Sequence, residues 1–286
     1  MKKHVGVKVV NRISNILIYI FLAFITIIWL FPFVYLLLNS LRGEDTAIAR
    51  YLWPKQFTFD NYIALFTDKT YNFFRWYINT LLIAVLVSII QTIIVLVTSY
   101  SLSRMRFNGR KALMKFMLII GMFPGFLSMI CIYRILQAIG LETSVFGLVI
   151  VYISGSMMGY YISKGFFDTI SKSLDEAAMI DGASRHTILW KIILPLSKPI
   201  VIYTILNSFL APWGDFMMSN FLVGRGSNTS WTVAVGLYQW LTPSNIPYYF
   251  TKFCAAGVVV SIVPVILYFV MQRFYVEGVT GGAVKG

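Results

Sequence analysis

The residue types that most often carry chemistry are scarce in this 286-residue chain. His4 and His186 are its only histidines, and Cys131 and Cys254 lie far apart in apolar surroundings. These four positions have neither the spacing of a metal site nor that of a disulfide framework. The sequence also has no recognisable nucleophile–base pair and no G-x-x-x-x-G-K-[ST] phosphate loop. An enzyme is therefore disfavoured, and any ATP chemistry has to come from a partner.

One polar stretch separates two apolar runs: EAAMIDGASRHTILWKIILPLSKP, residues 176–199. Asp175 and Glu176 come early in a predicted short helix, where the positive end of the helix dipole favours carboxylates. Asp181 and Gly182 predict a flexible break that ends this helix.

A second helix is predicted from Ser184 to Leu194, because apolar residues recur there at helical spacing. Pro195 is predicted to stop this helix and Pro199 to open the next apolar run. The stretch thus predicts a short helix, a bend and an amphipathic helix.

The elements around this insert have the composition of a membrane protein. The chain is 58% hydrophobic and only 12% charged, with a mean hydropathy of +0.75, whereas soluble domains are roughly 25% charged. The net charge of +13 could suggest nucleic-acid binding, but no polar domain is long enough to carry it. We therefore expect an all-α polytopic membrane protein.

A membrane-spanning helix needs about 20 mostly apolar residues. Six segments qualify and predict six transmembrane helices: 16–38, 78–102, 113–136, 145–163, 199–223 and 254–272. The first follows a basic N-terminus, but it is too long for a signal peptide and has no cleavage site, so it is interpreted as a retained span.

The distribution of basic residues predicts the orientation. If the N-terminus is cytoplasmic, 16 of the 24 Lys and Arg residues fall in cytoplasmic segments. Both termini and the polar insert are then cytoplasmic. Two long loops are then extracytoplasmic: 39–77, which includes the predicted interfacial helix WPKQFTFDNYIALF, and 224–253, with the apolar island VAVGLYQWL.

The insert alone could float at the lipid surface or dock a soluble partner. Its spacing E-A-A-x3-G-x9-I-x-L-P, however, resembles the signature loop of bacterial ABC importer permeases. It is carried by Glu176, Ala177, Ala178, Gly182, Ile192, Leu194 and Pro195. The resemblance implies the type I importer permease fold and a coupling helix, within a cytoplasmic loop over 168–198, that sits in a cleft of an ATPase subunit. Glu176 would pair there with a basic ATPase residue.

Other stretches resemble the MalG-type permeases of maltose and maltodextrin importers: WTVAVGLYQWL, the tail GVTGGAVKG, FPFVYLLLNSLR and RMRFNGRK. The resemblance covers nearly the whole chain and implies one permease domain, 1–286, in the bacterial cell membrane. It also implies a second permease subunit forming a heterodimer, an ATPase dimer that binds ATP and Mg, and an extracytoplasmic sugar-binding protein. This chain itself would hold no cofactor.

The resemblance also assigns the loop 224–253 to the binding protein, whose sugar site it would enter. Gly236, Tyr238, Gln239 and Trp240 are expected at its tip. The tail from Gly278 is expected to be flexible and, by resemblance, to reach the ATPase interface.

A transport path needs bent helices, and Pro124 and Pro212 predict breaks in the third and fifth spans. Both could equally be kinks required for packing. Asn207, Trp213 and Asp215 are the predicted path residues, since an indole face and a carboxylate suit a sugar ring. Relatives often have Trp-Asn before an acidic residue where this chain has Trp-Gly-Asp.

Two alternatives remain. A proton-coupled secondary transporter is disfavoured, because Asp215 is the only carboxylate expected within a span and no relay exists. A non-transporting assembly subunit stays open, although it gives no reason for so complete an insert. The sequence therefore favours one half of the pathway of an ATP-driven oligosaccharide importer.

Overall fold

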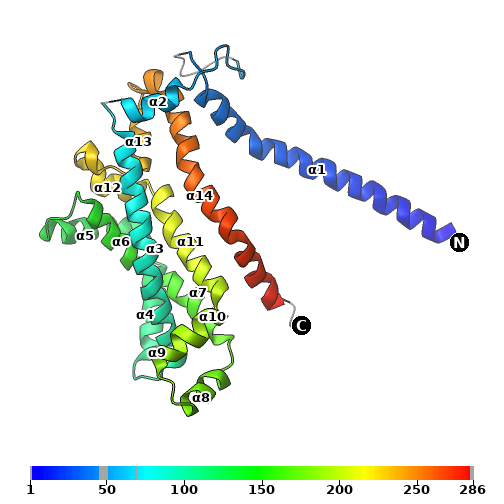
Figure 1. The fold of residues 1–286 in the computed structure, drawn as a ribbon, viewed down its shortest axis with the longest axis vertical. Coiled ribbons are helices and arrows are strands. Elements are labelled where there is room, and N and C mark those ends of the chain that lie inside the picture. Colours follow the sequence, from blue (N-terminus) through cyan, green and yellow to red (C-terminus); the bar gives the residue numbers. More distant parts are fainter. Residues whose placement is uncertain (1, 45–50, 69, 284–286) are drawn as a thin grey trace. The chain divides into compact units, whose positions relative to one another are not determined.

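The computed structural model describes residues 2–44, 51–68 and 70–283, and within these ranges every regular element is a helix. The elements form two compact units, residues 1–67 with 240–259, and 68–239 with 260–286. Each unit is considered by itself (Figure 1).

The first unit is built from three helical segments: α1 (Lys2–Ser40), α2 (Asp60–Thr67) and the beginning of α14 (Ile246–Ala283). Asn61 fixes α2 to the end of α1, because its side-chain amide donates to the carbonyls of Ser40 and Arg42. The Arg42 side chain is buried and contacts Asn39 and the carbonyls of Tyr51 and Leu52. The short helix predicted in the loop 39–77 is thereby confirmed as α2.

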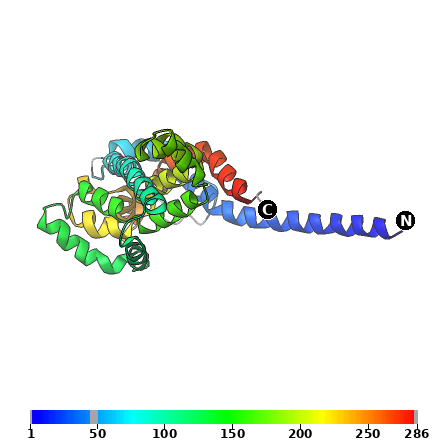
Figure 2. The ribbon, with the colours of Figure 1, turned by 90° about the horizontal axis from the view of Figure 1, so that it is seen from below.

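The second unit is organised around one long helix, α3 (Phe73–Arg104). The helices α6, α7 and α11 pack along it, and Figure 2 shows the bundle from the end that holds α8. The remaining elements of this unit follow in chain order: α4 (Arg110–Gly121), α5 (Gly125–Ala138), α6 (Val145–Ser154), α7 (Met157–Asp168), α8 (Ser173–Ile180), α9 (Arg185–Ile188), η1 (Leu189–Ile193), α10 (Leu194–Leu196), α11 (Lys198–Gly214), α12 (Met217–Leu222), η2 (Val223–Arg225), η3 (Asn228–Ser230) and α13 (Val233–Trp240).

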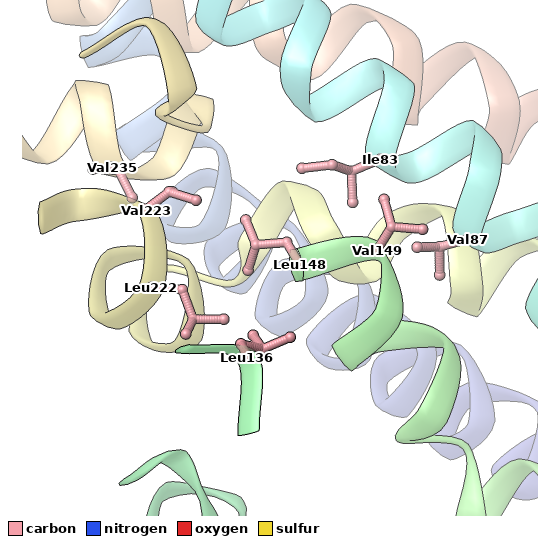
Figure 3. Packing of buried hydrophobic residues seen from close by; sticks show 8 residues of the cluster. All are labelled: Ile83, Val87, Leu136, Leu148, Val149, Leu222, Val223 and Val235. Atoms are coloured by element: carbon pink, nitrogen blue, oxygen red, sulfur yellow. The ribbon is translucent and has the colours of Figure 1, made fainter. Parts of the chain in front are cut away.

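A buried aliphatic cluster joins these helices (Figure 3). Ile83 and Val87 of α3 meet Leu148 and Val149 of α6, and Leu136, Leu222, Val223 and Val235 complete the cluster from α5, α12, η2 and α13. Gly147, in the first turn of α6, packs directly against the preceding loop. A side chain is excluded there, because a Cβ would lie 2.3 Å from the Leu141 carbonyl oxygen. The cluster anchors the short helices to α3.

Among the residues that the structure describes, three helices are long and apolar enough to cross a membrane: Arg12–Ser40, Phe73–Arg104 and Ile246–Gln272. Two bent pairs meet the same test, Val145–Ser154 with Met157–Asp168 at 42°, and Arg185–Leu196 with Lys198–Gly214 at 87°. The described chain therefore has three to five such spans by length and composition. Three predicted spans are continuous helices, and the other three are interrupted.

Proline and glycine explain where the predicted boundaries were wrong. The segment 113–136 divides into α4 and α5, because Pro124, in an extended conformation, precedes Gly125; this confirms the break predicted there. The segment 199–223 divides after Gly214, two residues beyond the predicted break at Pro212. The segment 145–163 bends at Gly155 and Ser156.

The last predicted span, 254–272, begins eight residues after the start of the helix that contains it. α14 starts at Ile246 rather than 254, because Pro247 at its second position suits the first turn of a helix. The loop 224–253 is correspondingly shorter and contains α13. The tail predicted to be flexible from Gly278 is helical to Ala283, and residues 284–286 lie outside the described residues.

Candidate functional site

The insert is fastened to the end of α3 by a buried ion pair. Arg104 Nε lies 3.0 Å from Asp175 Oδ2, and the two side chains are only 3% and 9% exposed. Arg104 also donates through Nη2 to the carbonyl of Ile170, at 2.9 Å. Asp175 stands in the first turn of α8, so the pair fixes the start of α8 against the last turn of α3.

A second polar contact ties the end of α7 to the same turn of α3. Ser103 Oγ donates to Asp168 Oδ1 at 2.6 Å, and Lys164 pairs with the other carboxylate oxygen. The segment between α7 and α8 is therefore attached to α3 at both of its ends, through Asp168 and through Asp175.

The bend between the two helices of the insert has the geometry expected of a glycine. Gly182 adopts φ +81°, where a side chain would be strained. Its N–H donates to the Met179 carbonyl, and Ala183 N–H donates to the Ala178 carbonyl at 2.9 Å. The Ser184 hydroxyl then caps the next helix by accepting from Thr187 N–H at 3.2 Å. The predicted bend is confirmed.

The second helix of the insert is buried along one face. Ile188, Leu189 and Ile193 pack with Phe167 of α7 and Ile200 of α11, and Leu96, Tyr100 and Ala178 complete the cluster. The amphipathic pattern predicted from residue 184 onward is therefore matched by a face directed into the protein.

Pro195 does not end this helix as predicted. The helical run continues from Arg185 to Leu196, and residues 189–193 form a π-helix in which Leu194 N–H donates to the Leu189 carbonyl. Proline has no N–H and its ring crowds the carbonyl four residues earlier. A widened turn before Pro195 relieves this conflict without breaking the helix.

The seven predicted coupling residues fall into two groups. Ala178 is buried and Ile192 and Leu194 are half-buried, so they hold the insert in place. The other four are exposed: Glu176, Ala177, Gly182 and Pro195.

Sequence reasoning missed Ile180, which is 87% exposed at the end of α8. An isoleucine placed just before the Asp-Gly break was the available signal. It also missed the partnership of Arg104 with Asp175, because the two are 71 positions apart and nothing local connects them.

The predicted path residues are not all in one place. Asn207 is exposed and lines a cavity of about 310 Å³ together with Gln91, Ser156 and Thr204. Trp213 is 8% exposed and packs edge-on against Tyr77, with ring centroids 5.4 Å apart. The Trp213 indole N–H has no hydrogen-bond partner among the described residues.

Asp215 has protein partners on both carboxylate oxygens. Tyr152 donates its hydroxyl to Oδ2 at 2.6 Å, and Met218 N–H donates to Oδ1 at 3.2 Å, capping α12. The Tyr152 hydroxyl also lies 3.1 Å from the Ser219 hydroxyl. In this conformation the carboxylate joins α6, α12 and the break after α11.

The apolar island of the last loop forms α13, which is packed against the beginning of α3. A Cβ on Gly236 would lie 2.0 Å from Trp76 Cε3, and Val233 N–H donates to Thr80 Oγ1 at 2.9 Å. Gly236 is therefore needed for the close approach of α13 to α3.

The four residues expected at the tip of this loop differ in exposure. Tyr238 is 51% exposed, with its ring 4.5 Å from that of Phe216. Gln239 is half-buried, while Gly236 is buried and Trp240 is 1% exposed. Of these four residues, only Tyr238 has an exposed side chain that a partner could contact.

The insert and α13 lie at opposite ends of α3. The insert contacts Arg104, whereas α13 contacts Trp76 and Thr80. At 1.5 Å per residue, Trp76 and Arg104 are about 40 Å apart along the helix, more than the roughly 30 Å hydrocarbon core of a bilayer. The two candidate contact regions are therefore attached to the two ends of α3, at a separation large enough to cross a bilayer.

Residues 97–280 match the family described as binding-protein-dependent transport system inner membrane component. The chain is 34% identical to the galactooligosaccharides transport system permease protein GanQ of Bacillus subtilis, over 98% of both chains. It is 35% identical to the maltodextrin permease MdxG of the same organism, over 96% of this chain and 98% of that one. It is 32% identical to the maltose/maltodextrin permease MalG of Escherichia coli, covering 96% and 95%.

The fold matches a solved bacterial ABC transporter involved in import of the acidic polysaccharide alginate. The TM-score is 0.78 at 23% identity, covering 93% of this chain and 97% of the other. A second structure, of a bacterial alginate ABC transporter in complex with an alginate pentasaccharide-bound periplasmic protein, gives 0.58 at 19% identity.

The family match and these relatives thus show a membrane permease subunit of the ABC importer class rather than an enzyme. The chain belongs to the binding-protein-dependent transport system inner membrane component family, and the resemblance to MalG-type sugar permeases is confirmed.

Proposed function

We propose that this chain forms half of the translocation pathway of an ATP-driven oligosaccharide importer and that α8 couples it to an ATPase. The observation that supports this most is the way α8 is presented. Arg104 and Ala178 hold one side of the helix, while Glu176 and Ile180 project from it. A helix that is fixed on one side and carries an exposed carboxylate and an exposed apolar side chain is suited to fill a cleft of a soluble partner.

In this proposal the chain crosses the membrane six times and both termini are cytoplasmic. The three continuous helices supply three crossings, and the bent pairs and α4 with α5 supply the others. Basic residues gather at the α8 end of α3, including Arg104, Arg106 and Arg110, which agrees with the positive-inside rule. The α13 end then faces the binding protein.

The partners proposed are a second, related permease, an ATPase dimer that binds ATP and Mg, and an extracytoplasmic sugar-binding protein. Support comes from the family description, which names binding-protein-dependent transport, and from relatives named for maltodextrin and galactooligosaccharides. We propose an oligosaccharide of this kind as the substrate.

The proposed path runs beside Asn207, which is exposed in the cavity next to α3 and α7. Trp213 lies near the end of the same helix, α11, and Asp215 directly follows that helix. In the described conformation their side chains contact Tyr77 and Tyr152. Their part in the path is proposed for a state in which the break after Gly214 has moved.

The test is reconstitution of the complete transporter in proteoliposomes. ATP-dependent uptake of radiolabelled maltodextrins and galactooligosaccharides is measured in the presence of the binding protein. The proposal predicts uptake of at least one sugar that requires ATP and this chain. Uptake that persists without ATP, or that needs only a proton gradient, would contradict it.

A further inference from the structure

A cationic cavity lies beside the insert and is lined by residues of α8 and of the end of α3. It has a volume of about 310 Å³, and five basic side chains line it: Arg104, Arg106, Arg110, Lys172 and Arg185. Two carboxylates line it as well, Asp175, which is paired with Arg104, and Glu176. The lining therefore has an excess of positive charge.

A second cavity adjoins the first and shares two lining residues with it. That neighbour measures about 730 Å³ and is formed by the turn between α3 and α4. Arg106 and Arg110 line both cavities, and Lys111 adds a further cation to the second. The two cavities together form one basic region at the end of α3.

Arg104 gives this region an unsatisfied donor. Its side chain is 3% exposed and lines the first cavity, yet its Nη1 has no hydrogen-bond partner among the described residues. A buried charged donor left without an acceptor is costly, so an anionic oxygen in the cavity would relieve a real deficit.

The start of α4 adds an independent reason to expect an anion. Gly109 precedes it with φ +85° and offers no side-chain cap. Arg110 and Lys111 occupy its first turn, and no acid does. Cations are unfavourable at the positive end of a helix dipole. An anion bound here would accept hydrogen bonds from N–H groups of the first turn and offset the unfavourable charge arrangement.

We propose that this basic region binds a phosphate group, supplied by an anionic phospholipid headgroup or by free phosphate. Arg106 and Arg110, shared by the two cavities, hold it, and Arg104 contributes its free Nη1. Asp175 of α8 already pairs with Arg104 Nε, so the anion takes the Nη1 side of the same guanidinium. Glu176 also lines the first cavity, so the site borders the face of α8 that is proposed to contact the ATPase.

The experiment uses the full chain in nanodiscs of phosphatidylcholine. Binding of short-chain phosphatidylglycerol and of inorganic phosphate is measured separately, for the wild type and for the double variant Arg106→Gln, Arg110→Gln. The matched control is Lys191→Gln, Lys198→Gln, which removes the same charge from two exposed positions nearby that do not line either cavity. Circular dichroism establishes that each variant is folded.

We expect the first variant to lose roughly tenfold or more in affinity, since each basic residue near a membrane surface contributes on the order of 1 kcal/mol, and the control to change less than about twofold. Loss for the lipid alone identifies a headgroup as the source, and loss for inorganic phosphate identifies a free anion. Failure of the wild type to bind either probe would overturn the proposal. So would equal losses in the variant and the control.

Discussion

Arg104 of α3 and Asp175 of α8 form an ion pair 3.0 Å long that joins the last turn of the longest helix in its unit to the first turn of the insert. Nearly all of both side chains is removed from solvent. The contact matters for function because α8 carries the residues that we propose to meet the ATPase. The ion pair thereby fastens the start of α8 to the end of α3.

Arg104→Gln should destabilise the chain by about 3 to 5 kcal/mol, because it leaves Asp175 buried and unpaired. The measurement is denaturation of the purified full chain in detergent. Lys164→Gln is the comparison, since the Lys164 and Asp168 side chains are 13% and 41% exposed and this pair is more open to water than the Arg104 pair. Its contribution should therefore be smaller, about 1 kcal/mol. Equal effects of the two substitutions would show that burial of the Arg104 pair has been overestimated.

Gly236→Ala should also destabilise the chain, because the added methyl group meets the Trp76 ring at 2.0 Å. Overpacking of this kind typically costs about 1 to 3 kcal/mol. Gly165→Ala serves as the control, since a Cβ at that helical position meets nothing within 4 Å. The same denaturation assay applies, and a Gly236→Ala chain as stable as Gly165→Ala would refute the close packing of α13.

Tyr152→Phe removes the hydrogen bond between the hydroxyl and the carboxylate and should lower stability by about 1.5 to 3 kcal/mol. Asp215→Asn keeps an acceptor oxygen but removes its charge, so it should lower stability by less. Uptake kinetics then separate packing from sugar contact. If Asp215 touches sugar during transport, only Asp215→Asn should raise KM. Wild-type stability of both variants would contradict the described contact.

Tyr238→Ala should reduce transport without reducing stability, because the ring is exposed on α13, where we propose that the binding protein docks. Val235→Ala is the contrasting variant: its side chain is fully buried, so it should reduce stability first. Uptake assays and denaturation curves on both chains provide the comparison. Normal uptake by Tyr238→Ala would remove the main support for a docking role of α13.

The insert was the part most completely predicted from sequence, because its structure depends on local rules. Carboxylates favour a helix start, and Gly182 supplies the positive φ that ends α8. The same local reasoning failed at Pro195, because burial of Ile188 and Ile193 holds the helix together through a π-turn. Tertiary packing outweighed the local preference of proline.

The candidate path was predicted less well, because its geometry depends on contacts between distant residues. Residue type indicated Trp213 and Asp215 as candidates for sugar contact. It did not indicate that Tyr77 and Tyr152 contact them. Similarly, the sequence indicated Gly236 as a residue of the last loop, but not that Trp76, 160 positions earlier, requires its small size. Periodicity predicts which residues are apolar, and only the fold determines what they meet.

Assembly with the ATPase tests the central claim most directly. Glu176→Lys reverses the exposed charge on α8, and Glu142→Lys makes the same change in the loop between α5 and α6. The measurement is the affinity of the reconstituted permease for its ATPase subunit, together with sugar uptake. We predict that Glu176→Lys weakens assembly by about 30-fold or more, as expected when roughly 2 kcal/mol or more of a charged contact is lost, and that Glu142→Lys assembles normally. Wild-type assembly and uptake by Glu176→Lys would contradict the coupling role of α8.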